Sequence, residues 1–463
     1  MRAPGEILLV ACYEMGHQPL AVAWPAAVLE QRGYRPAVLD LSLEPFDEEA
    51  VRRARLVALS VPMHTALRIG IQAAERIRSV NPSCHVSFYG LYASLNADHL
   101  LAGIADSVVG AEPEPALAEL AQALEAGRDA GEAAGVITAG RREPGRLARA
   151  ALPTPSRGSL LPLARYVRLE RAGKAELTGY VEASRGCLHL CRHCPIPPVY
   201  HGRFFAVPLE ACLADAAQQI EAGATHITFG DPDFLNGPTH ALRVARALHR
   251  DHPHVTFDFT AKIEHLLRHR ALLPELRALG CVFIVSAVES LSERVLEHLV
   301  KGHTRADVVE ALAAVRGAGI DLRPTWVAFT PWTTLDDYLE MLDFVEAHDL
   351  IDHVDSVQYA LRLLVPPGSL LVESPAFRPF MGDLSSEELS YRWAHPDPRV
   401  ERLQQAVNAA VGEAAARRED AAVTFRSVRE LAHAAAGRAL APAGPLPDAG
   451  RVRPPHLTEP WFC

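Results

Sequence analysis

The chain has 463 residues, of which 49% are hydrophobic and 22% charged, and its formal net charge at pH 7 is −10. This composition is that of an ordinary globular protein with room for two or three domains, and its acidic balance disfavours nucleic acid as a partner. Eight cysteines are too few for a disulfide scaffold, and no run approaches the roughly 20 apolar residues that span a bilayer, so we expect a cytoplasmic protein without a membrane partner.

Residues 1–127 alternate between short apolar runs and helical stretches. Runs rich in Val and Leu are typical of strands that are buried on both faces of a parallel sheet. We expect strands at Ile7–Ala11, Pro36–Leu41, Leu56–Val61, His85–Tyr89 and Ser107–Ala111. The pattern predicts a doubly wound, Rossmann-like α/β domain whose ligand lies at the carboxyl ends of the strands, near residues 12–17, 60–65 and 90–94.

A second alternation of strands and helices occupies residues 175–370, after a linker and lead-in over residues 128–174. We expect its strands at Gly179–Ser184, His226–Phe229, Val255–Ala261, Val282–Val288, Pro324–Phe329 and Ser356–Ala360. Six strand–helix units are too few for a closed eight-stranded barrel. Residues 371–436 predict a helical region, and residues 437–463 a flexible tail rich in Pro, Ala and Gly.

Three cysteines, Cys187, Cys191 and Cys194, lie on one short loop directly after the first strand of the second alternation. A cubane of four irons normally takes four cysteine ligands. Three thiolates would leave one iron open, as a catalytic zinc keeps a free position. On the loop alone, a Cys3His structural zinc site with a neighbouring histidine is the alternative. The long alternation after the loop favours the cluster, because a zinc knuckle does not need it.

The Cys-x3-Cys-x2-Cys spacing resembles the signature of the radical S-adenosylmethionine (radical SAM) superfamily. The resemblance implies an open partial (β/α)6 barrel, similar to a TIM barrel, with the cysteine loop at its C-terminal rim. It also implies a [4Fe–4S] cluster whose open iron chelates the amino and carboxylate groups of S-adenosylmethionine. An electron from a reductant such as flavodoxin or ferredoxin would then cleave its carbon–sulfur bond, and the adenosyl radical would abstract hydrogen from an unknown substrate.

Two of the positions that the resemblance assigns to S-adenosylmethionine follow the first two strands of the barrel. The backbone at Ile196, just after the third cysteine, would contact adenine, unless Ile196 only covers the cluster. Gly230, Asp231 and Asp233 occupy a position similar to the family's Gly-Gly-Glu-like motif. Asp231 or Asp233 would accept hydrogen bonds from the methionine ammonium. The alternative is an Asp-Pro turn that only caps the following helix.

A third position assigned by the resemblance is the polar pair Glu289 and Ser290, which closes the fourth expected strand. A polar pair at the end of an apolar strand faces the mouth of such a barrel. In similar proteins this pair accepts hydrogen bonds from the ribose hydroxyls or from the methionine end of S-adenosylmethionine. Capping of the next helix by Ser290 is the alternative, and both roles can hold together.

The N-terminal domain resembles the cobalamin-binding domain that is often fused ahead of a radical SAM barrel. The Asp-x-His-x-x-Gly motif that supplies a histidine ligand to cobalt is absent, and His17 is the only histidine in the first loop. A lone loop histidine is more often solvated than a ligand. Relatives also bind cobalamin without that histidine, so cobalamin remains a candidate cofactor; otherwise the domain only grips the substrate. Cobalamin-linked methyl transfer is the first reaction we expect, and methylthiotransferase-like sulfur insertion the second.

The chain ends in Thr458-Glu-Pro-Trp-Phe-Cys463. This segment resembles the start of the tail in a radical SAM group whose members end in Cys-Sec-Ala-Glu-Pro or Cys-Cys-Ala-Glu-Pro. The resemblance implies that the sequence was truncated where a UGA selenocysteine codon was read as a stop; a natural terminus with a surface cysteine is the alternative. Cys463 would then be a redox-active thiol that reaches the barrel mouth.

The leading hypothesis is therefore a radical SAM enzyme with a cobalamin-binding-like domain and a redox-active tail. A hypothesis from a different class is a non-catalytic protein that binds zinc on the cysteine loop and uses the tail as a thiol switch. The two hypotheses differ in metal content and in the formation of 5′-deoxyadenosine.

Overall fold

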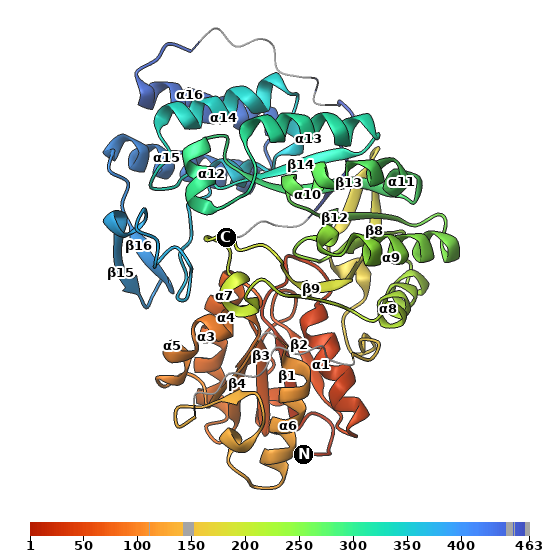
Figure 1. The fold of residues 1–463 in the computed structure, drawn as a ribbon. Coiled ribbons are helices and arrows are strands. Elements are labelled where there is room, and N and C mark those ends of the chain that lie inside the picture. Colours follow the sequence, from red (N-terminus) through yellow and green to blue (C-terminus); the bar gives the residue numbers. More distant parts are fainter. Residues whose placement is uncertain (111, 142–151, 441–447, 449, 459–463) are drawn as a thin grey trace.

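The computed structural model describes residues 1–463 except 111, 142–151, 441–447, 449 and 459–463. Figure 1 shows an N-terminal sheet with its helices at one end of the molecule and a curved, larger sheet at the other end. The segment that carries the cysteine loop lies where these two parts meet. Among the described helices, none is long and apolar enough to cross a membrane.

The N-terminal domain is a six-stranded sheet in the order β2-β1-β3-β4-β5-β6, parallel except for β6. Its strands are β1 (Ile7–Ala11), β2 (Ala37–Asp40), β3 (Leu56–Ser60), β4 (His85–Tyr89), β5 (Ser107–Val109) and β6 (Val136–Ile137). Its helices are α1 (Leu20–Gln31), α2 (Glu48–Arg53), α3 (His64–Val80), α4 (Leu91–Leu95), α5 (Ala97–Leu101) and α6 (Pro113–Glu125). This order confirms the predicted doubly wound fold, and β1/β3 is its switch point.

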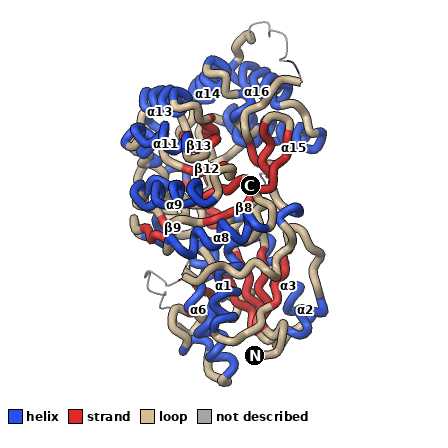
Figure 2. Tube along the Cα trace, turned by 90° about the vertical axis from the view of Figure 1, so that its right-hand side faces the viewer, coloured by secondary structure: helices blue, strands red, loops and turns tan. Residues whose placement is uncertain are grey.

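Both faces of the N-terminal sheet are buried, as the continuous apolar strands predict. In β1, Leu8 and Val10 belong to one hydrophobic cluster while Ile7, Leu9 and Ala11 belong to another. Figure 2 shows these strands between α1 on one side and α3 on the other. The two-residue β6 was not predicted, because so short a strand leaves no periodic pattern in the sequence.

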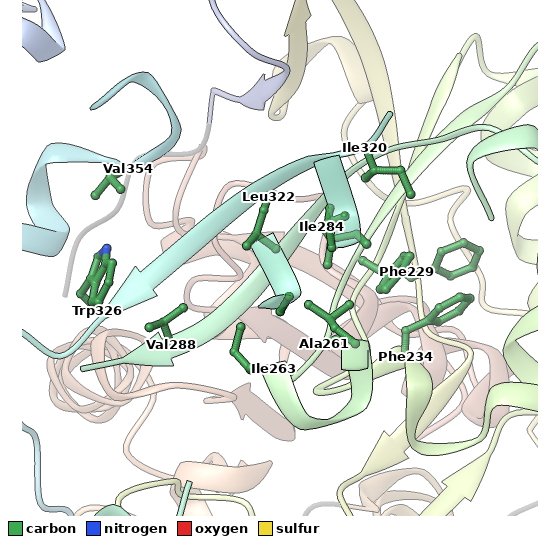
Figure 3. Packing of buried hydrophobic residues seen from close by; sticks show 14 of the residues in the cluster. Phe229, Phe234, Ala261, Ile263, Ile284, Val288, Ile320, Leu322, Trp326 and Val354 are labelled. Atoms are coloured by element: carbon green, nitrogen blue, oxygen red, sulfur yellow. The ribbon is translucent and has the colours of Figure 1, made fainter. Parts of the chain in front are cut away.

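The second sheet has seven strands in the order β14-β13-β12-β11-β8-β7-β17. The five central strands are parallel: β8 (Lys174–Val181), β11 (His226–Phe229), β12 (Thr256–Thr260), β13 (Cys281–Glu289) and β14 (Asp321–Trp326). The helices that follow them are α8 (Leu209–Glu221), α9 (Pro238–Asp251), α10 (Ile263–Arg268), α11 (Leu273–Ala278), α12 (Glu293–Leu299), α13 (Arg305–Gly317) and α14 (Leu335–Ala347). This is the predicted partial barrel, and Figure 3 shows side chains of β11, β13 and β14 in its core.

The prediction of a sixth barrel strand at Ser356–Ala360 is wrong, because these residues do not form a regular strand. Residues Ser356–Tyr359 form a 3-10 helix, and the sixth position is held by a single parallel bridge between Phe329 and Arg362. The reason lies in Gln358, whose side-chain oxygen accepts the hydrogen bond of the Trp326 backbone N–H, at 2.9 Å. A side chain thus replaces the backbone partner at the end of β14.

The C-terminal region departs from the helical prediction at its start. A hairpin of β15 (Met381–Ser385) and β16 (Ser390–Trp393) precedes the helices α15 (Pro398–Arg417) and α16 (Ala421–Ala436). In the expected flexible tail, β17 (His456–Leu457) pairs antiparallel with β7 (Arg168–Arg171) at the edge of the barrel sheet. The sequence does not reveal this pairing, since β17 is short and its partner lies far away in the chain.

A short connection joins the first barrel strand to the helix α8. It contains β9 (Ser184–Gly186), α7 (Pro197–Tyr200) and β10 (Phe204–Ala206), and β9 and β10 pair antiparallel. The remaining described elements are 3-10 helices at Ala130–Glu132, Leu163–Arg165, Phe234–Asn236, Arg270–Leu272, Ile351–His353 and Arg378–Phe380. The cysteine loop lies between β9 and α7, and so at the carboxyl end of the first barrel strand.

Candidate active site

The cysteine loop begins at a glycine that no other residue can replace without strain. Gly186 has φ +76°, and a Cβ atom there would collide with the Arg203 carbonyl oxygen and the Tyr200 ring. Cys187 and Cys191 are buried, and Cys194 is partly buried. The backbone N–H of Cys194 donates to the Cys191 carbonyl at 3.2 Å, which turns the loop back on itself. The three thiols therefore lie on one tight loop that buries its cysteines wholly or partly while Leu188 and Leu190 are exposed.

Contacts from three other parts of the barrel hold this loop. The side-chain oxygen of Asn236 accepts a hydrogen bond from the Leu188 backbone N–H at 3.2 Å, and it lies 3.8 Å from the Cys187 sulfur. The Arg192 backbone N–H donates to the Leu299 carbonyl at 3.0 Å. The Ser369 hydroxyl donates to the Arg192 carbonyl at 3.2 Å. Protein contacts alone thus hold the backbone of the loop in place.

The thiols suit an iron–sulfur cluster in chemistry and in surroundings. Burial raises the pKa of Cys194 to about 12 and also raises the pKa of Cys187. A buried thiol with a high pKa is inert until a metal displaces its proton. Soft thiolate ligands select iron–sulfur clusters among other soft metal centres. Cys187, Cys191 and Cys194 are therefore suited to hold such a cluster.

Gly230 and Asp231 organise the end of β11 next to the loop. A Cβ atom at Gly230 would collide with the ring of Tyr180. Asp231 accepts hydrogen bonds from the Ala183 backbone N–H, at 2.8 Å, and from the Ser184 hydroxyl. Burial raises the pKa of Asp231 to about 7, against the opposing effect of these hydrogen bonds. The carboxyl group thus ties β11 to β9, and its predicted contact with S-adenosylmethionine stays a prediction.

Asp233 is fully buried and makes the capping contacts that we gave as the alternative to ligand binding. Its carboxylate accepts hydrogen bonds from the backbone N–H groups of Leu235, at 2.9 Å, and Lys262, at 3.1 Å. It also lies 2.9 Å from Nδ1 of His265. Asp233 therefore joins the β11 and β12 ends, and its role toward S-adenosylmethionine stays a prediction.

Glu289 faces the cysteine loop from the end of β13. Its Oε1 lies 3.2 Å from Nζ of Lys301 and 3.3 Å from Nε2 of His193, the residue before Cys194. Its backbone has φ +65°, a conformation that costs energy for a residue with a side chain. Burial alone would raise the pKa of Glu289, but Lys301 and His193 outweigh burial and lower the pKa to about 2. The carboxylate is therefore ionised and fixed beside the loop.

Ser290 directly follows β13, and Ile196 directly precedes α7. The Ser290 hydroxyl accepts a hydrogen bond from the Ser292 backbone N–H at 3.1 Å. Ser292 is the N-cap residue of α12, and no side chain caps this helix through a hydrogen bond. Ile196 precedes α7, and its carbonyl accepts hydrogen bonds from Val199 and Tyr200. Ile196 also lines a cavity between the two domains. Their roles toward S-adenosylmethionine stay predictions.

The sequence analysis assigned no role in the site to four polar residues of this region: Asn236, Lys262, His265 and Lys301. Lys262 is the second residue after β12, and a polar residue at the carboxyl end of a barrel strand is a usable signal. Lys301 begins the stretch Lys301-Gly-His-Thr304, which resembles a fold marker of the family. No comparable signal marks Asn236 and His265. Their side chains reach the cysteine loop only because segments far apart in sequence fold together.

A cavity of about 260 Å³ lies between the two domains. It is lined by Glu14, Ser60, Met63, Gly90 and Leu91, which come from the three N-terminal loops where the sequence predicts a ligand. From the barrel side it is lined by Tyr180, Glu182, Arg185, Ile196 and Gly230. The carboxyl ends of both sheets thus meet at one space, next to the cysteine loop.

Carboxylates outnumber the positive charges at this cavity. Arg185 contacts Glu182 at 2.9 Å, Glu114 at 2.8 Å and Glu112 at 3.3 Å. Burial raises the pKa of Glu14 to about 8 and raises those of Glu112 and Glu182 as well. Buried carboxyl groups with raised pKa values are typical of functional sites. His17 is buried, and its ring stacks on that of Tyr180 with 4.4 Å between the ring centroids. The expectation that this histidine is solvated is therefore wrong.

Comparison with known proteins identifies the class of this site. Residues 181–345, from the end of β8 into α14, match the Radical SAM superfamily. The chain therefore contains a radical SAM domain. A [4Fe–4S] cluster and S-adenosylmethionine are accordingly its cofactors. The comparison leaves its reaction unspecified.

Two relatives show what this chain is similar to in sequence. The ribosomal protein uS12 methylthiotransferase RimO of Cereibacter sphaeroides is 28% identical over 192 residues, which cover 39% of this chain and 41% of the relative. An uncharacterized methyltransferase of Pyrococcus horikoshii is 21% identical over 337 residues, which cover 70% of this chain and 69% of the relative. The match to the first of them thus spans less than half of its length.

Two solved structures share the fold of most of the chain. The cobalamin-dependent radical enzyme OxsB, solved with aqua-cobalamin and S-adenosylmethionine, has a TM-score of 0.67 and 16% identity over 86% of this chain and 65% of its own. The radical S-adenosylmethionine methyltransferase TsrM from Kitasatospora setae, solved with cobalamin and a [4Fe–4S] cluster, has a TM-score of 0.58 and 20% identity over 74% of this chain and 70% of its own. At these identities the likeness shows the fold alone.

We predict that Lys301→Met destabilises the cluster-free protein by about 3 kcal/mol, because it leaves the buried Glu289 carboxylate without its main partner. Urea unfolding followed by circular dichroism measures the loss. The exposed Lys174→Met is the matched control and should change stability by less than about 0.5 kcal/mol.

The same unfolding experiment at several pH values tests how the stability contributed by the Glu289–Lys301 pair changes with pH. Since the folded pKa of Glu289 is about 2, below its ordinary value of 4.5, the pair stabilises the fold fully above pH 4.5 and loses its effect as the pH falls through 2. The double variant Lys301→Met/Glu289→Gln should recover most of the lost stability. Equal losses in the single and double variants would argue against an ion pair at this position.

Proposed function

We propose that this enzyme cleaves S-adenosylmethionine at the cysteine loop and modifies a substrate held between the two domains, by cobalamin-linked methyl transfer. The observation that carries the proposal is the shared cavity, which residues next to the cysteine loop and the carboxyl-end loops of the N-terminal sheet line together. The fold of cobalamin-dependent radical SAM enzymes over most of the chain supports it.

The side chains around the loop would bind and orient the reactants. When bound, the reduced cluster supplies the electron that cleaves S-adenosylmethionine. Glu289, held ionised by Lys301, would accept hydrogen bonds from its hydroxyl or ammonium groups. Asp231 at the end of β11 would accept from the ammonium. The backbone at Ile196, before α7, would contact adenine on the side of the cavity that Ile196 and Gly230 line.

Enzymes of this superfamily need an electron donor, and we propose a flavodoxin or a ferredoxin as that donor. We also propose that the protein is cytoplasmic. Sulfur insertion is the second candidate reaction, because the sequence resembles the methylthiotransferase RimO over the barrel. The superfamily match favours an enzyme over the non-catalytic zinc-binding alternative.

The first test concerns the cluster. Anaerobically reconstituted protein should contain about four irons per chain and form 5′-deoxyadenosine from S-adenosylmethionine when a reductant is added. Cys191→Ala should lose the iron and the product, because two thiols cannot hold the cubane. Cys84→Ala, at another buried cysteine in the N-terminal domain, should keep both. A colourless wild-type protein with one zinc per chain would overturn the assignment.

The side chains that line the cavity suit cobalamin chemically, but the volume of the cavity is small for a corrin. The carboxylates of Glu14, Glu114 and Glu182 can accept hydrogen bonds from the amide side chains of the corrin. The Gly90 backbone, with φ +104°, approaches the Val61 carbonyl, so this edge has no bulky side chain. The cavity of about 260 Å³ lies below the range of about 300–1,000 Å³ for drug-sized ligands. His17 is not among the residues that line this cavity, so the cavity itself offers no histidine ligand to cobalt.

We predict that the anaerobic protein retains about one hydroxocobalamin per chain through gel filtration, since one cavity offers one site. Leu91→Trp, which fills the cavity, should lower the retained cobalamin at least tenfold. Leu384→Trp, at an exposed leucine on β15, is the control and should not change it. If the wild type retains none, the N-terminal domain has only a substrate-binding role and the methyl-transfer proposal fails.

Cys463 lies outside the described residues, and its redox role remains our proposal. The direction of the strand β17 supports this proposal, because β17 runs parallel to β8. Thr458 follows β17 and its backbone N–H donates to the Arg168 carbonyl at 2.9 Å, so the chain runs toward the rim where β8 ends. Five further residues span at most about 17 Å. That length is enough to bring Cys463 to the junction of the two domains.

We predict that oxidation cross-links Cys463 to a cysteine introduced as Ala164→Cys, at the rim side of β7. The matched control is Lys174→Cys, which is equally exposed at the opposite end of the β7–β8 hairpin. Mass spectrometry of the linked peptides measures both yields, and the first should exceed the second at least fivefold. Equal yields would contradict a tail directed to the rim.

A further inference from the structure

Two histidines and an aspartate meet directly beside the cysteine loop. His189 lies on the loop between Cys187 and Cys191, His265 lies on α10, and Asp233 follows β11. One nitrogen of each histidine and one oxygen of Asp233 all lie within 4.8 Å of one another. Among the described residues, this is the one group of three or more such side chains that lie so close together.

The two histidine nitrogens that face each other are at the separation expected for two ligands of one metal ion. The short contact of Asp233 is with the other ring nitrogen of His265, and its carboxylate lies within 4.8 Å of the histidine pair. Nε2 of His189 lies 3.1 Å from Nε2 of His265, and two ligands at about 2.1 Å from one metal are about 3.0–3.4 Å apart. Oδ2 of Asp233 lies 2.9 Å from Nδ1 of His265, yet this nitrogen has no hydrogen-bond partner of normal geometry among the described residues. The two atoms are thus close without facing each other as donor and acceptor.

The three side chains are fixed from outside the group. His265 is 3% exposed and Asp233 0% exposed, and backbone N–H groups of Leu235 and Lys262 hold the aspartate. Oε2 of Glu264 lies 3.7 Å from Nδ1 of His189. A carboxylate beside the second nitrogen of a histidine is the usual way to orient a metal ligand. The group is therefore buried and pre-oriented.

We propose that His189, His265 and Asp233 bind one divalent transition-metal ion, separate from the iron–sulfur cluster. Two imidazoles and one carboxylate are a common ligand set for zinc and non-haem iron, and three protein ligands leave coordination positions free. The ion would fasten α10 and the end of β11 to the cysteine loop. This assignment gives Asp233 to the metal and leaves Asp231 for S-adenosylmethionine, and it does not depend on the proposed reaction.

Metal analysis with zinc as the probe tests the proposal. Cluster-reconstituted protein dialysed against micromolar Zn²⁺ should hold about four irons and one zinc per chain. His265→Gln should lose the zinc and keep the iron. His269→Gln is the matched control, one turn further along the chain with its ring 5.8 Å from that of His265, and it should keep both. Wild-type protein without zinc, or His265→Gln with zinc, would overturn the proposal.

X-ray absorption at the zinc edge of the wild type decides the case even if His265→Gln disturbs the fold. We expect nitrogen and oxygen neighbours at about 2.0–2.1 Å and no sulfur shell at about 2.3 Å. A sulfur shell would place the zinc on Cys187, Cys191 and Cys194 instead. In that case the three side chains only brace the loop through a hydrogen bond between the histidines, and the metal proposal is wrong.

Discussion

The hydrogen bonds that hold the backbone of the cysteine loop are the constraint on which the rest of the site depends. Three thiols on eight residues can share one cluster only if the backbone of the loop is held in place, and the contacts of Asn236, Leu299 and Ser369 with the loop do this. The partners come from the ends of three different barrel segments. A partial barrel therefore supplies what a zinc knuckle lacks, a rigid rim around an otherwise mobile loop.

Charge is distributed unevenly around this rim. On the barrel side, Glu289 is balanced by Lys301 and stays ionised beside the loop. On the side of the N-terminal domain, Arg185 alone faces Glu112, Glu114 and Glu182, so burial raises the pKa of two of these carboxyl groups. Such an excess of buried carboxyl groups is costly unless protons or a ligand with hydrogen-bond donors satisfy them. The junction is therefore prepared for a ligand that donates hydrogen bonds.

The sequence predicts the parts of this protein whose signal is local. Continuous apolar runs located β1, β3, β4, β11 and β13, and the spacing of Cys187, Cys191 and Cys194 predicts the cluster site. The hairpin of β15 and β16, the edge strand β17 and the 3-10 helix at Ser356–Tyr359 were missed, because they depend on partners elsewhere in the chain. The same holds for His265, which lies 76 residues from its contact His189. Tertiary contacts, not local patterns, complete the site.

The central claim is that Cys187, Cys191 and Cys194 hold a cluster with one iron open to S-adenosylmethionine. Electron–nuclear double resonance on the reduced cluster tests it most directly, with S-adenosylmethionine labelled isotopically at its amino nitrogen and carboxylate oxygens. The account predicts strong couplings from both labels, because both groups would bind the same iron. A reduced cluster that shows neither coupling at saturating S-adenosylmethionine would contradict it.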